Sequence, residues 1–404
     1  MTAVLERLDT PGGATWTIGG PRLLAALNTY DVLDAATHLA THGPMPATDR
    51  PRLQALLDSV AITGRGGATL RLATRLRALQ ARRPQILVDG TEPEPASLKD
   101  RVLLGRAPHL VLDGALAVAS AVGARAVAVA VRDPLAAAAV RTAAAQRPDG
   151  ALVRVSVISG DPRRVVQALD GAPAFGLGRR SPPAADGAVV ANPETLAQLA
   201  VLLRLGPRRF AETGTLAEPG TTLLTLRGAV GRPGVVEIPL GTPLGIVLEA
   251  AGAVEPVAVI SGGYHGSWLA PVAQLRLSRA GLAAAGGILG AGVLVVVDSR
   301  TCALGELARA TAWLAGDAPD QCGPCRTGSP ALAADLEDLY RGDRAALDSV
   351  FDRARALMGC GACGHPAGIA RFVTSGLHLL HDETDLHLRS GGCGRPVLGQ
   401  LRPA

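Results

Sequence analysis

Apolar and polar residues follow two different spacings in the first half of the chain. Short apolar runs bounded by turn residues predict buried strands at 86–88, 126–131 and 151–158. Around these runs, apolar residues recur at helical spacing, which predicts helices at 70–82, 98–104, 115–122, 134–145 and 193–205. Strands that alternate with helices favour a mostly parallel sheet covered by helices, so the sequence predicts an α/β fold.

The spacing of apolar residues changes near residue 221. A helix at 243–251 and four short apolar runs are typical of a small β-grasp-like domain, and the runs cover 222–227, 234–239, 257–261 and 293–298. Beyond residue 301 the pattern is helical, and the predicted helices cover 304–314, 330–341, 345–358 and 367–381. The segment from residue 389 onward is rich in Gly and Pro, and we expect it to be disordered.

The composition limits which residues can build the core. With 404 residues, the chain is long enough for two or three domains and a sizeable core. Aromatic residues make up only 2% of the chain, so aliphatic side chains must fill that core. Few aromatic faces are then left to stack on a nucleotide base or on a flavin ring.

The formal net charge of +5 comes from scattered arginines, and Lys99 is the only lysine. No basic run is interleaved with aromatic residues, which counts against nucleic-acid binding. No stretch reaches the roughly 18 consecutive apolar residues that suggest a membrane-spanning helix, since Arg125 interrupts the nearest candidate at 114–131. The first residues contain no apolar signal segment, so we expect a cytoplasmic protein.

Four of the six cysteines form two Cys-x-x-Cys pairs, which are Cys322/Cys325 and Cys360/Cys363. Soft thiolates grouped in this way suit an iron–sulfur cluster or zinc. Two structural disulfides are the alternative, but a reducing cytoplasm favours metal. The other two cysteines, Cys302 and Cys393, stand alone in the sequence, and we expect them to be inert thiols rather than ligands.

A glycine-rich segment, Gly64-Arg65-Gly66-Gly67, precedes the predicted helix at 70–82. Glycines let backbone N–H groups approach a phosphate closely because no Cβ intervenes. Taken alone, however, a plain turn explains this segment better, since the chain contains 49 glycines.

The segments around the glycine-rich turn and the cysteines share a family resemblance. They read GRGGA at 64–68, EPEP at 92–95, KDR at 99–101, ANPETLA at 191–197, TLRGAV at 225–230, RPGV at 232–235, PLGTPL at 239–244 and CGPCRTG at 322–328. In this order, over roughly residues 60–385, the chain resembles the flavin-carrying, NADH-oxidising subunit of respiratory complex I.

This resemblance implies how the chain divides into domains. A Rossmann-like flavin domain would cover 60–215, and a β-grasp domain of the ubiquitin-like, SLBB type would cover 216–300. A helical bundle with an iron–sulfur site would cover 301–388. The remaining segments are an N-terminal lead-in at 1–59 and a tail at 389–404.

The resemblance also assigns positions in a flavin site. Arg75 stands where the family has Lys, which keeps a positive charge in a different geometry. The family's Asn and Asp become Asp89 and Thr91, whereas its Glu and one of two Asn residues are kept. The implied FMN contacts are therefore Gly64, Arg65, Gly66, Gly67, Arg75, Asp89, Thr91, Glu92 and Asn192.

The segments that would bind NADH depart further from the family. Val157 replaces a Tyr, and Asp161-Pro162 replaces a pair of Glu residues. Leu70 and Ala184 stand where the family has Phe. Adenine stacking and ribose hydrogen bonds lose their usual side chains, which counts against ordinary NADH oxidation.

The family binds its four-iron cluster through three closely spaced cysteines and a fourth further along. In the matching register Cys322 and Cys325 are the second and third ligands, and Cys363 is the fourth. The first position holds Pro319, which cannot ligate. Cys360 has no counterpart, and we hypothesise that it replaces the missing ligand. The spacing alone also allows a zinc site made of the same four thiolates.

The resemblance implies an electron-transfer oxidoreductase subunit of the NADH-dehydrogenase type, with FMN and a 4Fe-4S cluster as cofactors. The implied partner is a small ferredoxin-like or thioredoxin-like iron–sulfur protein, or a membrane-bound redox complex that holds the chain at the cytoplasmic face. With the NADH positions altered, the electron donor need not be NADH, and no catalytic residue is assigned. The alternative is a non-catalytic scaffold or assembly subunit that keeps zinc or a cluster as a structural element.

Overall fold

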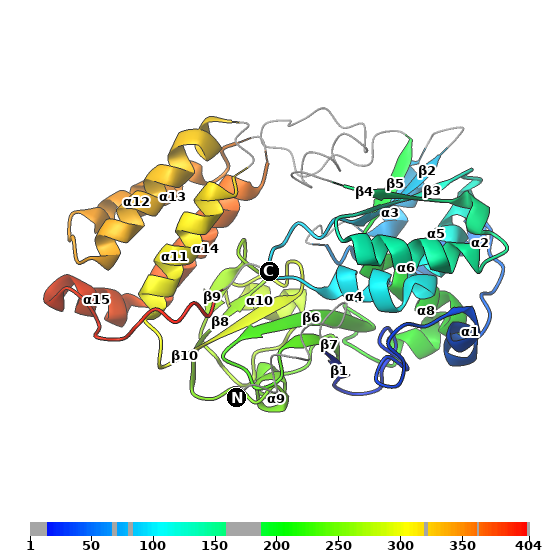
Figure 1. Ribbon diagram of the computed structural model, residues 1–404, viewed down its shortest axis with the longest axis horizontal. Coiled ribbons are helices and arrows are strands. Elements are labelled where there is room, and N and C mark those ends of the chain that lie inside the picture. Colours follow the sequence, from blue (N-terminus) through cyan, green and yellow to red (C-terminus); the bar gives the residue numbers. More distant parts are fainter. Residues whose placement is uncertain are drawn as a thin grey trace.

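The computed structural model describes residues 14–66, 71–79, 84–158, 187–318, 322–361 and 363–401. Within these residues the chain forms three parts, which lie next to one another in Figure 1. They are a four-stranded sheet with its helices, a six-stranded sheet, and a group of C-terminal helices. The described chain is therefore a mixed α/β protein, as predicted.

The first sheet is parallel throughout and has the strand order β4-β3-β2-β5. Its short strands are rich in Val and Ala, and they comprise β2 (Gln85–Gly90), β3 (Val127–Val131), β4 (Val153–Val157) and β5 (Ala188–Ala191). The apolar runs predicted as strands are confirmed as β2, β3 and β4, while β5 was not predicted.

Helices accompany this sheet, and several begin at residues that can cap them. They comprise α1 (Ala35–His42), α2 (Arg50–Ser59), α3 (Leu72–Ala78), α4 (Lys99–Arg106), α5 (Pro108–Val122), α6 (Pro134–Ala145) and α8 (Pro193–Ala211), with the 3-10 turn η2 (Gly150–Leu152). The side chain of Asp133 accepts the N–H of Leu135 at 2.9 Å at the start of α6. That of Asn192 accepts the N–H of Thr195 at 3.2 Å at the start of α8. A proline follows each cap, which suits the first helical position.

Helices α5 and α8 pack at close range in the core of the first part. A Cβ at Gly114 of α5 would lie 2.0 Å from the carbonyl oxygen of Leu196 in α8, so this approach requires glycine. Aliphatic side chains such as Val111, Leu112 and Leu199 fill the surrounding core, as the composition predicts.

The second sheet is mixed and has the strand order β1-β7-β6-β10-β8-β9. Its strands comprise β1 (Thr15–Thr17), β6 (Thr221–Gly228), β7 (Gly234–Pro239), β8 (Pro256–Ser261), β9 (Ser267–Leu269) and β10 (Val293–Asp298). The β1–β7 and β6–β10 pairs are parallel and the other pairs are antiparallel. Helices α9 (Leu244–Ala250) and α10 (Arg279–Ala284) belong to this part. The strands predicted at 222–227, 234–239, 257–261 and 293–298 are confirmed.

The N-terminal segment attaches to the second sheet through β1 and through a buried carboxylate. Glu237 of β7 is 1% exposed and accepts the backbone N–H groups of Arg22, Leu23 and Leu24 at 2.9–3.0 Å. Burial raises the pKa of Glu237, whereas these donors act in the opposite direction. The segment treated as a lead-in therefore contributes a strand and a set of hydrogen bonds to the second sheet.

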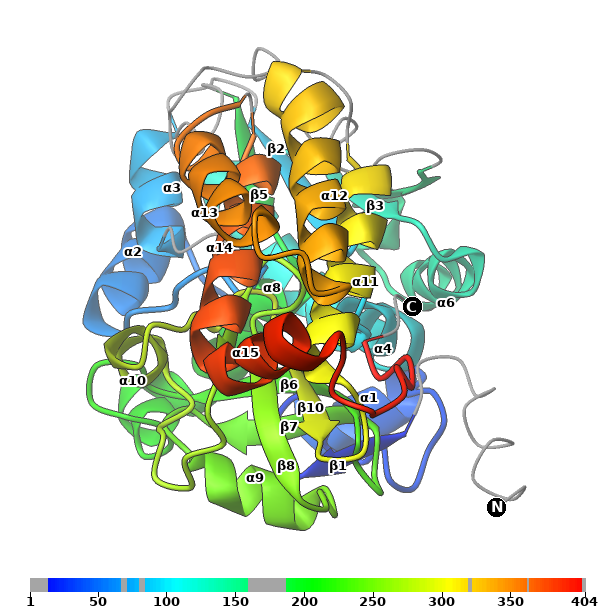
Figure 2. The ribbon, with the colours of Figure 1, turned by 90° about the vertical axis from the view of Figure 1, so that its left-hand side faces the viewer.

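Helices form the C-terminal part, and they comprise α11 (Ala303–Gly316), α12 (Ser329–Tyr340), α13 (Ala346–Leu357), α14 (His365–Leu379) and α15 (His381–Ser390), with the π-helical turn η3 (Pro324–Gly328). Figure 2 shows α11 to α14 side by side above the second sheet, with α15 crossing near their lower end. The predicted helices are confirmed as α11 to α14, while α15 was not predicted.

Aromatic side chains gather where the C-terminal helices meet the second sheet. The ring centroid of Phe372 in α14 lies 6.2 Å from that of Tyr264 and 5.8 Å from that of Trp268. The rings of Tyr264 and Trp313 of α11 lie 5.6 Å apart. Aromatic pairs at such distances add to the stability gained by burial. A large share of the scarce aromatic residues therefore joins these two parts.

The expectation of a disordered C-terminal segment is wrong for residues 391–401. The side chain of Gln400 donates to the Asp298 carboxylate at 2.8 Å, and Leu401 is 1% exposed. The backbone N–H of Gln400 donates to Glu306 of α11 at 2.9 Å. The segment is ordered because its polar groups bond to side chains of β10 and α11, which its own composition does not reveal.

Among the described residues, no single helix is both long enough and apolar enough to cross a membrane. Helices α4 and α5 meet that test only when they are taken together, and the chain bends by 92° between them.

Candidate functional site

The glycine-rich turn is held by residues from two parts of the molecule. The backbone N–H of Arg65 donates to the Thr195 hydroxyl at 3.0 Å, at the start of α8. The guanidinium of Arg279, the first residue of α10, donates to the carbonyl of Gly64 at 2.9 Å. Gly67, which was also assigned to the site, lies outside the described residues. The turn is thus fixed jointly by the first part and the second sheet.

A cavity of about 80 Å³, here called the turn cavity, opens beside this turn. It lies at the carboxyl ends of the parallel strands β2 and β5, the edge at which open α/β sheets bind ligands. Its lining consists of Gly64, Gly66, Leu72, Arg75, Asp89, Val190, Ala191, Asn192 and Thr195. The structure therefore brings together five residues that the resemblance assigned to FMN, namely Gly64, Gly66, Arg75, Asp89 and Asn192.

Arg65 places a buried positive charge within the turn. Its side chain is 3% exposed, and its ion-pair partner Glu194 lies 4.0 Å away. Its Nε and Nη1 atoms have no hydrogen-bond partner among the described residues. Burial lowers the pKa of Arg65 to about 10, so the guanidinium still carries its charge at neutral pH. A buried guanidinium with unused donors favours an anion such as phosphate.

Lys99 lies in a buried ion-pair network rather than in the lining of the turn cavity. Its Nζ atom is 2.9 Å from the Asp100 carboxylate and 3.2 Å from that of Glu194. Burial alone would lower the pKa of Lys99, but these two carboxylates raise it above its ordinary value. Because Glu194 is in the first turn of α8, the network fixes α4 against α8.

Thr91 and Glu92, also assigned to FMN, do not line the turn cavity. Glu92 accepts hydrogen bonds from the Ser97 hydroxyl at 2.6 Å and from the N–H of Asp100 at 3.0 Å, which caps the start of α4. The Thr91 hydroxyl donates to Asp89 at 2.7 Å. Both residues therefore position neighbours of the cavity rather than face into it.

The described residues fit the phosphate portion of flavin mononucleotide. The turn cavity of about 80 Å³ holds a phosphate-sized group or several waters, and it is smaller than the roughly 300–1,000 Å³ of typical ligand pockets. The guanidinium of Arg75 in its lining and that of Arg65 in the turn supply positive charge. The glycines at 64 and 66 let the backbone approach the anion.

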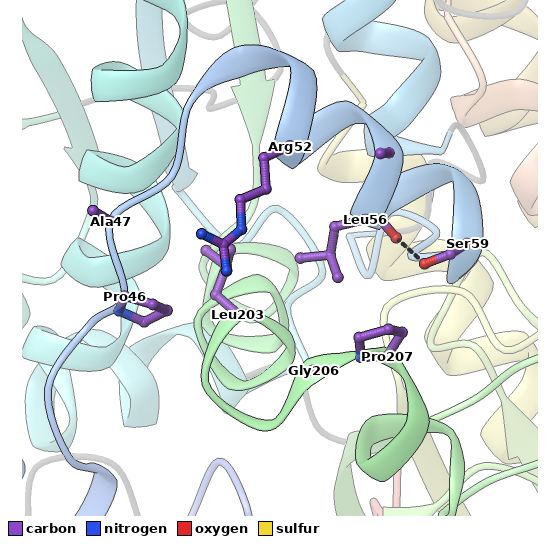
Figure 3. A pocket seen from close by; sticks show the side chains of 9 residues that line it. Pro46, Ala47, Arg52, Leu56, Ser59, Leu203, Gly206 and Pro207 are labelled. Carbon is purple, nitrogen blue, oxygen red and sulfur yellow. Dashed lines mark hydrogen bonds between the residues drawn. The ribbon is translucent and has the colours of Figure 1, made fainter.

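A larger cavity, of about 360 Å³, lies between α2 and the kinked end of α8 (Figure 3). Its lining is mainly apolar and includes Leu56, Leu203 and Pro207. Its polar side chains are Arg52 and Ser59, and the Ser59 hydroxyl donates back to the carbonyl of Leu56 at 2.7 Å. This cavity lacks the converging polar groups that mark the turn cavity, so its size does not make it the functional site.

The two Cys-x-x-Cys pairs lie on neighbouring loops at one end of the C-terminal helices. The carbonyl of Cys322 accepts the N–H of Cys325 at 3.1 Å, at the start of η3. Cys360 and Cys363 lie in the loop between α13 and α14. A Cβ at Gly361 would lie 3.5 Å from the Cys322 sulfur, so the second loop packs against the first. Thiols on two adjacent loops are the kind of ligands that an iron–sulfur cluster or zinc takes, although the ligand atoms of these four cysteines do not form a group within 4.8 Å among the described residues.

His365 supports the second of these loops. It is buried at the start of α14, and its Nδ1 atom lies 2.9 Å from Nε2 of His265. Its own Nε2 atom lies 3.0 Å from the carbonyl oxygen of Leu314 in α11. Both ring nitrogens of His365 therefore have hydrogen-bond partners. This fixes the ring and the loop that carries Cys360 and Cys363, which is the role of residues that support metal ligands without binding the metal.

The positions that depart from the family's NADH pocket are only partly described. Val157 is the last residue of β4 and is 46% exposed. Leu70, Asp161-Pro162 and Ala184 lie outside the described residues, as does Pro319 at the vacated ligand position.

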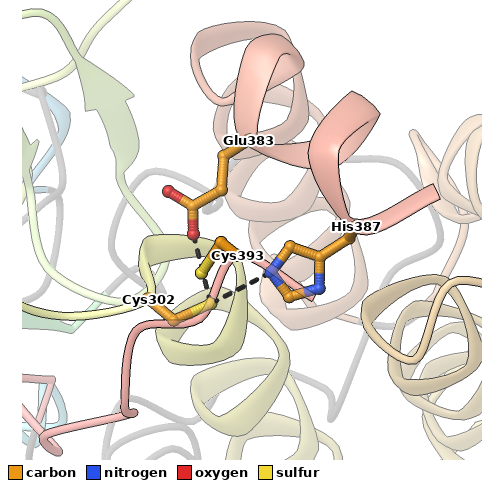
Figure 4. Close-up of side chains that lie close together, drawn as sticks. All are labelled: Cys302, Glu383, His387 and Cys393. Carbon is orange, nitrogen blue, oxygen red and sulfur yellow. Dashed lines mark hydrogen bonds between the residues drawn. The ribbon is translucent and has the colours of Figure 1, made fainter. Parts of the chain in front are cut away.

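The remaining two cysteines do not stand alone in the folded chain. Cys302, Glu383, His387 and Cys393 each place one ligand atom within 4.8 Å of the others (Figure 4). Cys302 and Cys393 stand apart in the sequence but lie together in the fold, because α15 and the C-terminal segment return to the start of α11. The sequence did contain one signal, since Glu383 and His387 are spaced to share a helix face.

Two protein-family models match the regions that contain these sites. Residues 57–201 match the Nuo51 FMN-binding domain, and residues 301–387 match the iron–sulfur binding region of NADH-ubiquinone oxidoreductase-F. The first match contains the turn cavity, and the second contains both Cys-x-x-Cys pairs.

Curated relatives cover most of the chain at low identity. The F-type subunit of the NADH-quinone oxidoreductase of Mycobacterium bovis is 29% identical over 97% of this chain and 95% of its own length. Its counterpart in Escherichia coli K12 is 24% identical over 79% of each chain. Among solved structures, an NAD⁺-reducing NiFe-hydrogenase in the H₂-reduced state has a TM-score of 0.78 at 24% identity. The match covers 93% of this chain and 68% of that chain, and it shows a shared fold.

Proposed function

The chain is a divergent member of the family of F-type subunits of NADH-quinone oxidoreductase, and on that premise we propose that it is an electron-transfer subunit holding FMN and a 4Fe-4S cluster. The observation that carries this proposal is the lining of the turn cavity. Five residues assigned to FMN by resemblance converge there from distant segments, beside the buried charge of Arg65.

The proposal assigns a role to each part of the fold. The parallel sheet and its helices, at 60–215, are the Rossmann-like flavin domain. The second sheet, at 216–300, is a β-grasp domain of the SLBB type, supplemented by β1 from the N-terminal segment. The helices at 301–388 carry the cluster, and the C-terminal segment packs against them.

When bound, FMN exchanges an electron pair at its ring and passes electrons on singly. Gly64 and Gly66 would present backbone N–H groups to its phosphate, and Arg65 and Arg75 would balance the phosphate charge.

Polar side chains behind the phosphate complete this proposed site. Asp89 and Asn192 would offer an acceptor and an amide to polar atoms of the cofactor. Thr91 would orient Asp89 through the 2.7 Å hydrogen bond, and Glu92 would hold α4 in place.

The proposed cluster ligands are the thiolates of Cys322, Cys325, Cys360 and Cys363. Cys360 would replace the ligand that the family supplies at the position of Pro319. The packing of Gly361 against the Cys322 sulfur supports a site shared by the two loops. Cys325 is buried, whereas Cys360 is exposed, so one edge of the site faces the surface.

That exposed edge suggests where electrons leave the chain. The curated relatives are named as subunits, which implies redox partners in a larger assembly. We propose a small ferredoxin-like or thioredoxin-like iron–sulfur protein that approaches the Cys360 side, because electron transfer requires two centres to lie close together.

Cofactor analysis of the anaerobically purified chain tests the flavin assignment. We expect FMN in the wild-type protein and its loss in Arg75→Leu, which removes a charge from the turn cavity. Arg77→Leu is the matched control on the same helix, because Arg77 pairs with Asp58 at the exposed surface. Retention of FMN by Arg75→Leu, or its equal loss in both variants, would contradict the assignment.

Iron and sulfide analysis tests the ligand set. Cys360→Ser should lose iron and acid-labile sulfide, whereas Cys393→Ser should keep both. NADH is then added to the protein. If the flavin absorbance bleaches, NADH is an electron donor despite the altered positions. A colourless protein that contains zinc and no flavin would contradict the electron-transfer proposal and favour a non-catalytic scaffold subunit.

A further inference from the structure

A second group of soft ligands lies at the opposite end of α11 from the Cys-x-x-Cys pairs. Cys302 is the N-cap of α11, and Cys322 follows the carboxyl end of the same helix. Because α11 has 14 residues, the two ends are separated by about 21 Å along the axis. One ion cannot bridge that distance, so the two groups are separate.

The members of this group, here called the Cys302 cluster, come from three elements (Figure 4). Cys302 precedes α11, Glu383 and His387 lie on successive turns of α15, and Cys393 lies in the C-terminal segment. Their ligand atoms all lie within 4.8 Å of one another. Cys302 is fully buried and His387 is 2% exposed, so the centre of the group is shielded from water.

The distances within the Cys302 cluster approach those of a tetrahedral metal site. The Cys302 sulfur lies 3.1 Å from Glu383 Oε1 and 3.4 Å from His387 Nε2. In a tetrahedral zinc site, metal–sulfur and metal–nitrogen bonds of about 2.3 and 2.1 Å separate such ligand atoms by about 3.5 Å. Small side-chain shifts would therefore admit an ion between them.

Groups behind the ligands already orient them for this role. The Nδ1 atom of His387 lies 2.6 Å from the carbonyl oxygen of Tyr340, which can only accept a hydrogen bond. Nδ1 must therefore carry the proton, which leaves the Nε2 lone pair directed at the Cys302 sulfur. Metal-ligating histidines commonly donate their other ring N–H to a carbonyl or carboxylate in this way.

The carboxylate and the thiol are held in a similar way. Arg395 donates to Glu383 Oε2 at 2.7 Å, and the N–H of Leu304 donates to Oε1 at 3.1 Å. The N–H of Gly305 donates to the Cys302 sulfur at 3.3 Å, which suits a thiolate at a helix N-terminus.

The charges also balance when an ion is placed there. Two thiolates and one carboxylate carry three negative charges, and a divalent cation with Arg395 supplies three positive charges. Sulfur and imidazole ligands together favour zinc over calcium or magnesium, which prefer oxygen.

We propose that Cys302, Glu383, His387 and Cys393 bind one Zn²⁺ ion, which fastens α15 and the C-terminal segment to the start of α11. A disulfide between the two cysteines is the competing explanation, but it would leave the oriented His387 and Glu383 without a role. The full burial of Cys302 also argues against a nucleophile that meets a substrate. This inference does not depend on FMN or on the iron–sulfur cluster.

Metal analysis of the full chain, purified anaerobically and loaded with equimolar zinc, tests the proposal. We expect one zinc per chain in addition to any iron. His387→Ala and Cys393→Ser should each weaken zinc binding at least about tenfold and leave the iron content unchanged. His381→Ala is the matched control on α15, since His381 is exposed and should keep zinc.

X-ray absorption at the zinc edge identifies the ligands independently of the variants. We expect two sulfur and two nitrogen or oxygen neighbours, and this result holds even if a variant fails to fold. A shell of four sulfurs would place zinc at the Cys-x-x-Cys pairs and overturn the proposal. Failure to retain zinc, or a Cys302–Cys393 disulfide found by mass spectrometry in the anaerobic protein, would overturn it as well.

Discussion

Glu94 should make the stability of this protein depend on pH. It lies in the loop between β2 and α4 and is 8% exposed, and its carboxylate accepts the backbone N–H of Tyr264 at 3.2 Å. Burial raises the pKa of Glu94 to about 7, against the effect of the N–H donors from Tyr264 and Ala96. A Cβ at Gly263 would lie 2.3 Å from the carboxyl carbon, so the second sheet encloses this group tightly.

The size of the effect follows from this pKa. A rise from 4.5 to about 7 corresponds to about 3 kcal/mol, at 1.36 kcal/mol for each tenfold change in proton affinity. Because the folded pKa is the higher one, the folded state binds more protons between these values. The contribution of Glu94 to stability is therefore fully present below pH 4.5, falls as the pH rises to about 7, and then stays constant.

Glu94→Gln mimics the protonated form and removes this dependence. Relative to wild type, we expect Glu94→Gln to gain about 2–3 kcal/mol in free energy of unfolding between pH 5 and pH 8. This difference in the free energy of unfolding is measured by chemical denaturation, monitored through the fluorescence of Trp268 and Trp313, which pack close to Tyr264. The control is Glu249→Gln on the exposed face of α9. A stability difference between Glu94→Gln and wild type that does not change with pH would refute the reasoning.

Three further substitutions probe buried contacts by equilibrium denaturation. The Asp113 carboxylate lies 2.5 Å from the Arg204 guanidinium, and Asp113→Asn should cost about 3–5 kcal/mol because it leaves a buried cation without its partner. Glu237→Gln turns an NH₂ group toward backbone donors, so we expect a loss of about 1–3 kcal/mol and faster proteolysis of the N-terminal segment. Gly114→Ala forces a methyl group onto the Leu196 carbonyl, and a loss of about 3 kcal/mol is expected.

Exposed or open positions provide controls for these three changes. Asp352→Asn on α13 and Glu249→Gln on α9 replace solvent-exposed carboxylates. Gly105→Ala on α4 adds a methyl group with no heavy atom within 4 Å apart from its chain neighbours and its own helix backbone, so it should be neutral or slightly stabilising. A buried substitution that behaves like its control would show that the contact assigned to it does not hold the fold.

Elements that bury their own apolar residues could be predicted from the sequence. The run Val127–Val131 is continuous and aliphatic, and it forms β3 at the interior of the parallel sheet. Thr15–Thr17 has no such pattern, and it becomes β1 only because β7 offers an edge to pair with. Likewise, order in residues 391–401 depends on partners in β10 and α11 rather than on composition.

In the candidate sites, too, some residues could be found from the sequence and others depend on the packing of distant segments. Gly64, Asp89 and Asn192 were found because the family resemblance assigned positions to them, and the parallel sheet brings these positions to one edge. Arg279 was not found, since its role arises from the packing of the second sheet on the first part. The grouping of Cys302 with Glu383, His387 and Cys393 was not found, because these three residues lie on a helix and in an ordered segment that the pattern did not predict.

The hydrogen bond from Arg279 to Gly64 also has a consequence for the order of events during synthesis. The two residues are 215 positions apart, so ribosomes working at about 5–20 residues per second need roughly 10–40 s to supply Arg279 after Gly64. During that interval the flavin-type domain can begin to fold, but its turn lacks the brace from α10. The glycine-rich turn therefore gains its complete set of hydrogen bonds only after most of the chain has been synthesised.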